Sequence, residues 1–167
     1  MNTLEYLPHE ELEDALDVVE QTLLAANWVC ERSEEGVIHC ATSTRWGECG
    51  GMFVWRDEPA SIHFSLSLDL KSSPARERAV SDLLRKMNER LWLGHFDYWP
   101  EDGVGVFRHT IPMLDRSAPE PGEIAAILAA ALDGAEQFLP AFNFVVWAGQ
   151  SPDEALAASL FETAGEA

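Results

Sequence analysis

The segment from Ser61 to Leu70 constrains the fold more than any other part of the sequence, because polar and apolar residues alternate along its whole length. The apolar positions are Ile62, Phe64, Leu66, Leu68 and Leu70. A period of two places one set of side chains on a core and the other set toward water or a partner. The segment is therefore predicted to be a half-buried strand of an antiparallel sheet.

Further short apolar segments between turn residues predict the rest of this sheet. Residues 33–36 end in Gly36 and are expected to form a hairpin turn, and residues 101–103 are expected to join a second strand pair. The predicted strands cover residues 28–32, 37–42, 51–56, 61–70, 96–99 and 104–111.

Apolar residues at helical spacing predict one helix before these strands and one among them. The first is expected to begin at Pro8 and to end near Asn27. The second is expected to begin at Pro74, with Glu77 placed for a capping interaction, and to end at Gly94. Its predicted buried stripe is Val80, Leu83, Leu84, Met87 and Leu91.

Two more helices are predicted after the last strand. One runs from about Gly122 and should kink or stop at Pro140, because proline lacks the backbone N–H that a helix needs. Residues 142–147 fit both a helix and a strand, and we favour the helix. Ser151 and Glu154 form a capping box that predicts a short final helix over residues 153–162.

The order of these elements predicts an α+β fold. Strands joined by tight turns favour an antiparallel, twisted sheet of five to six strands, with the helices packed on one face. The sequence contains no internal repeat and no convincing linker, so residues 1–167 are predicted to form a single domain.

The chain is strongly acidic, with 11 Lys and Arg against 29 Asp and Glu and a net charge of −18. Such a chain repels phosphate backbones and offers no basic stripe that could release counterions from DNA. We therefore expect neither nucleic-acid binding nor docking to an anionic membrane. The charge instead favours solubility, or steering toward basic partners.

The cysteines and the start of the chain suggest a reducing cytoplasm. Cys30, Cys40 and Cys49 are odd in number and lack C-x-x-C spacing, which argues against a disulfide framework and a thiolate zinc site. The first residues are acidic where a signal peptide would carry Lys or Arg. The longest uninterrupted apolar run, residues 124–132, is too short to span a bilayer.

Sequence motifs for catalysis or cofactor binding are missing, so no enzyme activity, cofactor or metal is predicted. The five histidines show no H-E-x-x-H spacing, and the glycine-rich stretches lack the lysine of a phosphate loop. His39 and His63 could lie on neighbouring strands, with Cys40 on the opposite face. Cys49, before two glycines, is interpreted as a semi-exposed structural thiol.

Two aromatic groups stand out from this background. Trp46 lies in an Arg-Trp-Gly-Glu stretch, and Trp92, Phe96, Tyr98 and Trp99 lie close together with Asn, Arg and His between them. These residue types are enriched at interface hot spots, although aromatic clusters between a helix and a strand usually belong to a core. The core interpretation is favoured about two to one.

Several of these stretches resemble the YbjN family, a group of small bacterial proteins described as sensory transduction regulators. The resemblance rests on residues 45–47, 88–99, 106–110 and 140–157, and on the C-terminal residues 162–167. It implies a fold like that of type III secretion chaperones, in the order α-β-β-β-α-β-β-α. It also implies a dimeric, acidic, peptide-binding module, and it supplies no catalytic residue.

These observations together predict a non-enzymatic, cytoplasmic adaptor or chaperone-like regulator. It is expected to form a homodimer and to bind a protein segment of unknown identity across an exposed sheet face or along a strand edge. The candidate partner-binding residues are Trp46, His63, Ser65, Ser67, Trp92, Trp99 and Arg108.

Two alternatives remain open at this point. The first is a small-molecule or metal sensor that uses His39, His63 and Cys40. The second is an enzyme, which would require Asn88, Arg108 or His109 to cluster within a deep pocket.

Overall fold

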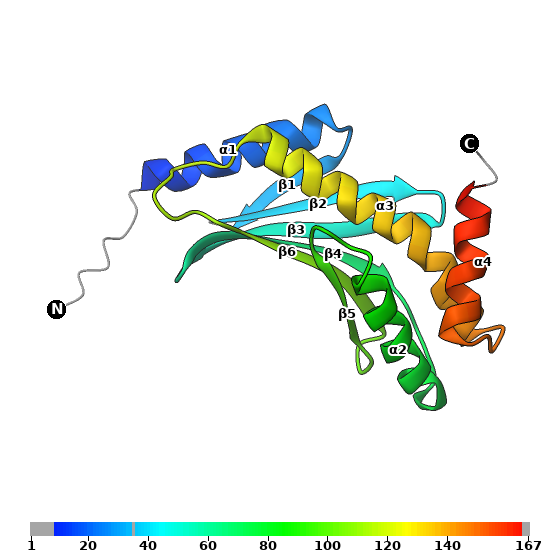
Figure 1. Ribbon diagram of the computed structural model, residues 1–167. Coiled ribbons are helices and arrows are strands. Elements are labelled where there is room, and N and C mark those ends of the chain that lie inside the picture. Colours follow the sequence, from blue (N-terminus) through cyan, green and yellow to red (C-terminus); the bar gives the residue numbers. More distant parts are fainter. Residues whose placement is uncertain (1–8, 35, 165–167) are drawn as a thin grey trace.

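The computed structural model describes residues 9–34 and 36–164 and confirms the α+β class (Figure 1). The predicted first residue of the first helix, Pro8, lies outside this range, as do residues 165–167. The elements are α1 (His9–Ala25), β1 (Val29–Glu34), β2 (Val37–Thr44), β3 (Gly47–Asp57), β4 (Ala60–Asp69), the 3₁₀ turn η1 (Pro74–Arg76), α2 (Glu77–Asn88), β5 (His95–Trp99), β6 (Val104–Pro112), α3 (Pro121–Val146) and α4 (Pro152–Ala164).

The strands form one antiparallel sheet in the order β1-β2-β3-β4-β6-β5. The first four make a meander of neighbouring hairpins. The chain then crosses through α2 to the outer edge, forms β5, and returns as β6 between β5 and β4. The secretion-chaperone order implied by the resemblance has three strands before its second helix, whereas this chain has four.

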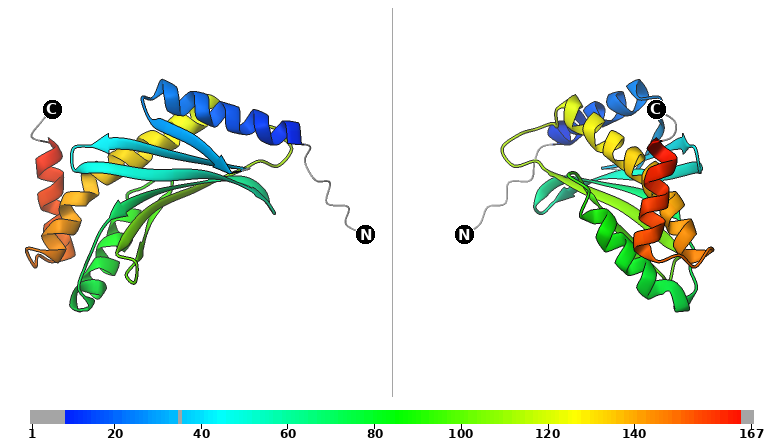
Figure 2. Two further views of the ribbon diagram at one scale, coloured as in Figure 1. Left: turned by 180° about the vertical axis from the view of Figure 1, so that it is seen from behind. Right: turned by 45° about the vertical axis from the view of Figure 1, so that its right-hand side comes forward.

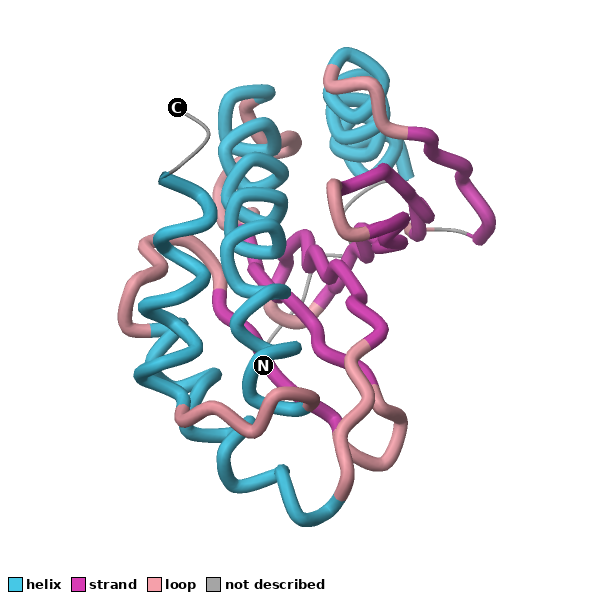
Figure 3. Tube along the Cα trace, turned by 90° about the vertical axis from the view of Figure 1, so that its right-hand side faces the viewer, coloured by secondary structure: helices cyan, strands magenta, loops and turns pink. Residues whose placement is uncertain are grey.

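The alternation along β4 separates the two faces of the sheet as predicted. Ile62, Phe64 and Leu66 are fully buried, and they meet the apolar sides of the helices. The helices follow one side of the twisted sheet in every view (Figures 1 to 3). This side is called the helical face below, and the other side is called the open face.

The second helix begins and ends differently from the prediction. Residues 74–76 form a 3₁₀ turn before α2, and the side chain of Ser73 caps neither, so the predicted capping interaction with Glu77 is wrong. The helix ends at Asn88 instead of Gly94. Its buried residues, Val80, Leu83, Leu84 and Met87, are those predicted, whereas Leu91 lies beyond its end.

Helix α3 continues through Pro140 without stopping, so residues 142–146 are helical. Pro140 has no N–H with which to bond the carbonyl oxygen of Glu136, four residues earlier. The indole Nε1–H of Trp46 donates to that oxygen instead, at 3.3 Å. A side chain from the β2–β3 turn thus satisfies the carbonyl group that the proline leaves without its helical partner.

By length and composition, α3 is the one helix among the described residues that could cross a membrane. Half of its most apolar window is buried inside the fold. Ile127, Ala131 and Phe138 of this helix belong to the core, and a largely buried apolar helix is common in a globular domain.

The last helix, α4, begins as the sequence predicts. The Ser151 side chain accepts a hydrogen bond from the backbone N–H of Glu154 at 3.3 Å, and the Glu154 carboxylate accepts one from the backbone N–H of Ser151 at 3.0 Å. These reciprocal bonds are a capping box. Helix α4 packs against α2 and α3.

Candidate protein-binding face

The open face carries the polar half of β4. From β4 it receives Ser61, His63, Ser65, Ser67 and Asp69, which alternate with the buried apolar residues. No helix among the described residues packs on this side of the sheet (Figures 1 and 2). The open face is therefore a broad surface built on a rigid sheet.

The strand register brings four of the predicted partner-binding residues together. His63 lies opposite Thr110, and its Nδ1 is 2.8 Å from the Thr110 hydroxyl oxygen. Ser65 lies opposite Arg108, and Ser67 lies opposite Val106. His63, Ser65, Ser67 and Arg108 thus form one continuous patch across β4 and β6.

Cationic groups gather at the Ser61 end of this patch. Burial lowers the pKa of His63, and the neighbouring Arg108, Arg56 and His95, together with His109, lower it further. The Arg108 guanidinium is partly neutralised by Asp97, whose Oδ2 lies 2.9 Å from its Nη1. The register places the acidic Asp69 and Asp97 on the same face, so the charge of the open face is mixed.

Trp99 lies at the edge of the same face. It follows the half-buried Tyr98 on β5, lies opposite Val104, and is 47% exposed. Its ring is a large, half-wet surface of the kind enriched in binding hot spots.

Trp46 does not belong to the open face. Its indole contacts Glu136 of α3, and the backbone N–H of Arg45 donates to the carboxylate of the same residue at 3.5 Å. The structure therefore assigns Trp46 a contact within the fold, although 45% of its surface remains exposed.

Trp92 lies in the connection between α2 and β5 and is 98% exposed. The residues around it are held within the fold. The Asn88 side chain bonds both backbone groups of Phe96, at 2.7 and 3.0 Å, and the backbone N–H of Gly94 donates to Nδ1 of His109 at 3.1 Å. Trp92 is the most exposed large apolar side chain of this stretch and is available to meet a partner.

The three residues that the enzyme alternative requires, Asn88, Arg108 and His109, do not share a site. Asn88 is engaged by the backbone of Phe96, and Arg108 is engaged by Asp97. His109 follows Arg108 directly along β6, so the two side chains lie on opposite faces of the sheet. The cluster required for that alternative is not formed.

The residues of the metal-sensor alternative are also apart. His39 on β2 and His63 on β4 both reach the open face, but β3 lies between them, so the expectation of neighbouring strands was wrong. Cys40 lies on the helical face, where burial raises the pKa of its thiol to about 12. The described part of the chain holds no group of three side chains that could bind a metal ion.

Cys49 is placed differently from its interpretation as a semi-exposed thiol before a turn. Strand β3 begins at Gly47, two residues earlier, so Cys49 lies within the strand and is buried on the helical face. Burial raises the pKa of its thiol, which opposes formation of a thiolate nucleophile.

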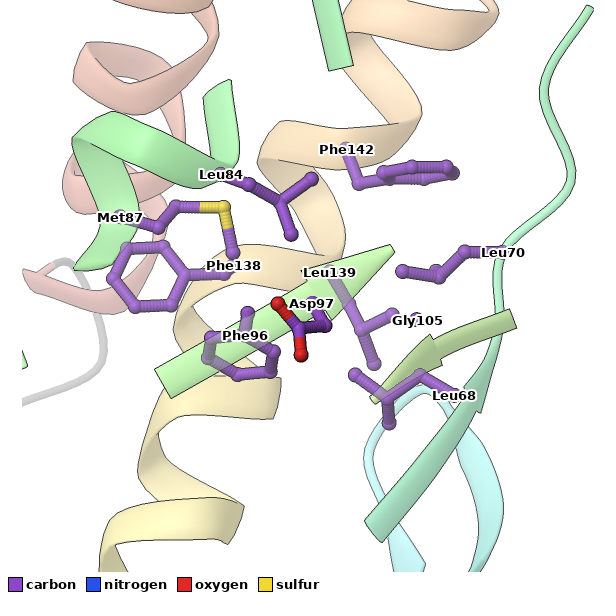
Figure 4. A pocket seen from close by; sticks show the side chains of 10 residues that line it. All are labelled: Leu68, Leu70, Leu84, Met87, Phe96, Asp97, Gly105, Phe138, Leu139 and Phe142. Atoms are coloured by element: carbon purple, nitrogen blue, oxygen red, sulfur yellow. The ribbon is translucent and has the colours of Figure 1, made fainter. Parts of the chain in front are cut away.

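A small apolar cavity lies between α2, α3 and the sheet (Figure 4). Its walls include Leu84, Phe96, Phe138 and Phe142, and its volume is about 10 Å³. A space of this size holds about one water molecule, and Asp97 is the one polar residue of an otherwise apolar lining. The cavity gives the small-molecule alternative no support.

A family model described as "Putative bacterial sensory transduction regulator", named YbjN, matches residues 15–144. This range begins within α1, contains the whole sheet and ends near the end of α3. The chain belongs to the YbjN family. No curated protein and no solved structure matches it at a significant level.

The YbjN match covers the patch residues and their neighbours, although several of these neighbours could not be identified from the sequence. His95, Asp97 and Thr110 join His63 and Arg108 only because β6 pairs with β4 and β5, whereas Arg56 lies on β3 opposite Ser61. The sequence shows how polar and apolar residues alternate along each strand, but it does not show the order of the strands in the sheet. The family description is that of a regulator and names no reaction.

Proposed function

We propose that this YbjN-family protein is a non-enzymatic, cytoplasmic regulator that binds another protein across the open face of its sheet. The observation that carries the proposal is the continuous polar patch of His63, Ser65, Ser67 and Arg108. This patch is bordered by Trp99 and left uncovered by the described helices. We also propose that the protein forms a homodimer.

Binding across the face is favoured over addition of a strand at the β5 edge. Both backbone groups of Phe96 that could pair with an added strand are already bonded to the side chain of Asn88. A partner segment lying across β4 and β6 would meet hydroxyl and cationic groups instead.

The test compares partner capture by the intact chain and two variants. Ser67→Arg adds a long charged side chain to the middle of the open face, where Ser67 is exposed between Gly50 and Val106. Ser81→Arg makes the same change on the exposed side of α2 and serves as the control. Captured proteins would be quantified by mass spectrometry, and sedimentation would give the oligomeric state.

The proposal predicts partners that are retained by the wild type and by Ser81→Arg but lost by Ser67→Arg. A purified partner should bind Ser67→Arg at least about tenfold more weakly, a loss of roughly 1.4 kcal/mol. Equal capture by all three proteins would exclude the open face as the binding site.

A further inference from the structure

Two cysteines face each other across the first strand pair. Cys30 on the edge strand β1 lies directly opposite Cys40 on β2. Directly opposite residues of an antiparallel ladder have Cα atoms roughly 4.5 or 5.5 Å apart, and both spacings fall within the range found for disulfides. The register therefore gives this pair a Cα spacing that is compatible with a disulfide.

Both thiols lie on the helical face. Cys40 is 5% exposed, and Cys30 is partly buried and packs against the same core. After burial, Cys30 is the largest contributor to the raised pKa of Cys40, which agrees with their proximity. Both cysteines are free thiols in this structure.

We propose that Cys30 and Cys40 form a specific disulfide by exchange with a small-molecule disulfide of the glutathione class. The Cys30 thiol loses its proton and attacks the small disulfide, which forms a mixed disulfide at Cys30 and releases one thiolate. The Cys40 thiol then loses its proton, attacks the Cys30 sulfur and releases the second thiolate. Two protein thiols are oxidised, one small disulfide is reduced, and the two released thiolates take up two protons.

The geometry decides the order of these steps. Cys30 is the more exposed of the pair and lies on the edge strand, so it is the thiol that a reagent reaches first. Cys40 is shielded and acts only on the neighbouring sulfur. Burial raises the thiol pKa of both cysteines, so each step is slow at neutral pH and becomes faster as the pH rises.

Cys49 is excluded from this bond by its register. The residue opposite Cys40 on β3 is Gly51, whereas Cys49 lies opposite Thr42 and bonds the carbonyl oxygen of that residue. Diagonal neighbours of this kind are roughly 7–8 Å apart, beyond the reach of an unstrained disulfide. The exchange therefore selects two of the three cysteines.

The site is independent of the open face, because its side chains lie on the other side of the sheet. The disulfide would link the edge strand β1 covalently to β2. Whether this link is present would depend on how oxidised the surrounding thiol pool is. The bond is expected to be absent in a reduced glutathione pool and to form when the pool becomes oxidised.

The test uses the full chain, fully reduced and then equilibrated in glutathione buffers of increasing disulfide fraction. Free thiols are trapped with N-ethylmaleimide and counted by intact-mass spectrometry, and peptide mapping locates the bond. We expect two of the three alkylated thiols to be lost together, with a Cys30–Cys40 cross-link. Cys49→Ser should behave like the wild type.

Cys40→Ala keeps the buried position apolar and should stop at a glutathione adduct on Cys30. Three alkylated thiols in the most oxidising buffer would overturn the proposal, and so would a bond to Cys49 or a wild-type protein that stops at the adduct. Circular dichroism of each variant confirms that the comparison is made between folded proteins.

Discussion

The indole Nε1–H of Trp46 donates to the carbonyl oxygen of Glu136, the backbone group that Pro140 leaves without its helical donor. The contact joins the β2–β3 turn to the middle of α3. Trp46 and Pro140 both lie in stretches that carry the resemblance to the YbjN family. We interpret the two residues as one structural unit, in which a side chain replaces a missing backbone hydrogen bond.

This interpretation predicts coupling between Trp46 and Pro140. Trp46→Phe removes the N–H and should lower the free energy of unfolding by about 0.5–1.5 kcal/mol. In a Pro140→Ala background the alanine N–H can bond Glu136, so the same substitution should cost less. Urea unfolding of the four proteins gives the coupling energy. Trp92→Phe, on an exposed ring, is the control, and an equal cost of Trp46→Phe in both backgrounds would contradict the interpretation.

Gly94 is predicted to be intolerant of any side chain. Its φ is +68°, and a Cβ atom there would lie 2.2 Å from Cζ of the buried Phe107 ring. Gly94→Ala should therefore lower the free energy of unfolding by about 2–4 kcal/mol. Gly122→Ala in the first turn of α3 is the matched control, because nothing lies within 4 Å of its Cβ position. It should be neutral or stabilising by up to about 1 kcal/mol.

Asn88 should stabilise the sheet edge through both of its amide groups. Asn88→Ala leaves the two Phe96 backbone groups without their side-chain partner and should cost about 1–3 kcal/mol in urea unfolding. Asn88→Asp can still accept a hydrogen bond from the Phe96 N–H, but at neutral pH it cannot donate one to the Phe96 carbonyl oxygen. Its stability should therefore lie between those of the wild type and Asn88→Ala. Asn143→Ala, on the exposed side of α3, should change stability by no more than about 0.5 kcal/mol.

Substitutions of Trp92 and Phe96 should have different effects on stability and on partner binding. Phe96 is 3% exposed and packs edge-to-face on Phe107 and Phe138, so Phe96→Ala should cost about 3–5 kcal/mol. Trp92→Ala should change stability by no more than about 0.5 kcal/mol, because its side chain is almost entirely in solvent. If Trp92 contacts the partner, the same substitution should weaken partner capture, and a large loss of stability would show instead that the ring is needed for folding.

The start of α3 should become less stable in acid. Hydrogen bonding to Arg116 holds the pKa of Glu123 below its usual value of 4.5. The folded chain thus binds this proton more weakly than the unfolded chain does. The resulting stability is fully present above the unfolded value and is lost as the pH falls through the lower folded value.

Arg116→Met should reduce this acid sensitivity. Urea midpoints measured from about pH 3 to pH 7 should fall less steeply at the acid end for the variant than for the wild type. Arg85→Met removes an exposed arginine from α2 and serves as the control. Parallel acid limbs for the wild type and Arg116→Met would exclude the contribution of this pair.

The sequence was most informative where local rules decide the structure. The alternation from Ser61 to Leu70 predicted which side chains of β4 are buried, because the period of the strand alone assigns them to a face. The capping box of Ser151 was also predicted, since both of its bonds are made within four residues. The alternation alone therefore predicts that His63, Ser65 and Ser67 share one face of the sheet.

Contacts between distant residues could not be predicted in this way. Arg108 joins His63 only because β6 is inserted between β4 and β5. Pro140 was expected to kink or stop its helix, but the missing bond is replaced by a side chain 90 residues away. The sequence likewise does not show that the indole group of Trp46, a predicted partner-binding residue, contacts α3.

The insertion of β6 between two earlier strands also bears on how the chain reaches its fold. The meander from β1 to β4 can assemble from adjacent hairpins, whereas pairing of Ser61 with Pro112 must wait for α2 and the β5–β6 hairpin. Until then β4 presents bare backbone groups along a strongly apolar strand. A nascent chain that pauses at this stage would expose an aggregation-prone flank, so slow docking of the last hairpin would favour aggregation over the native fold.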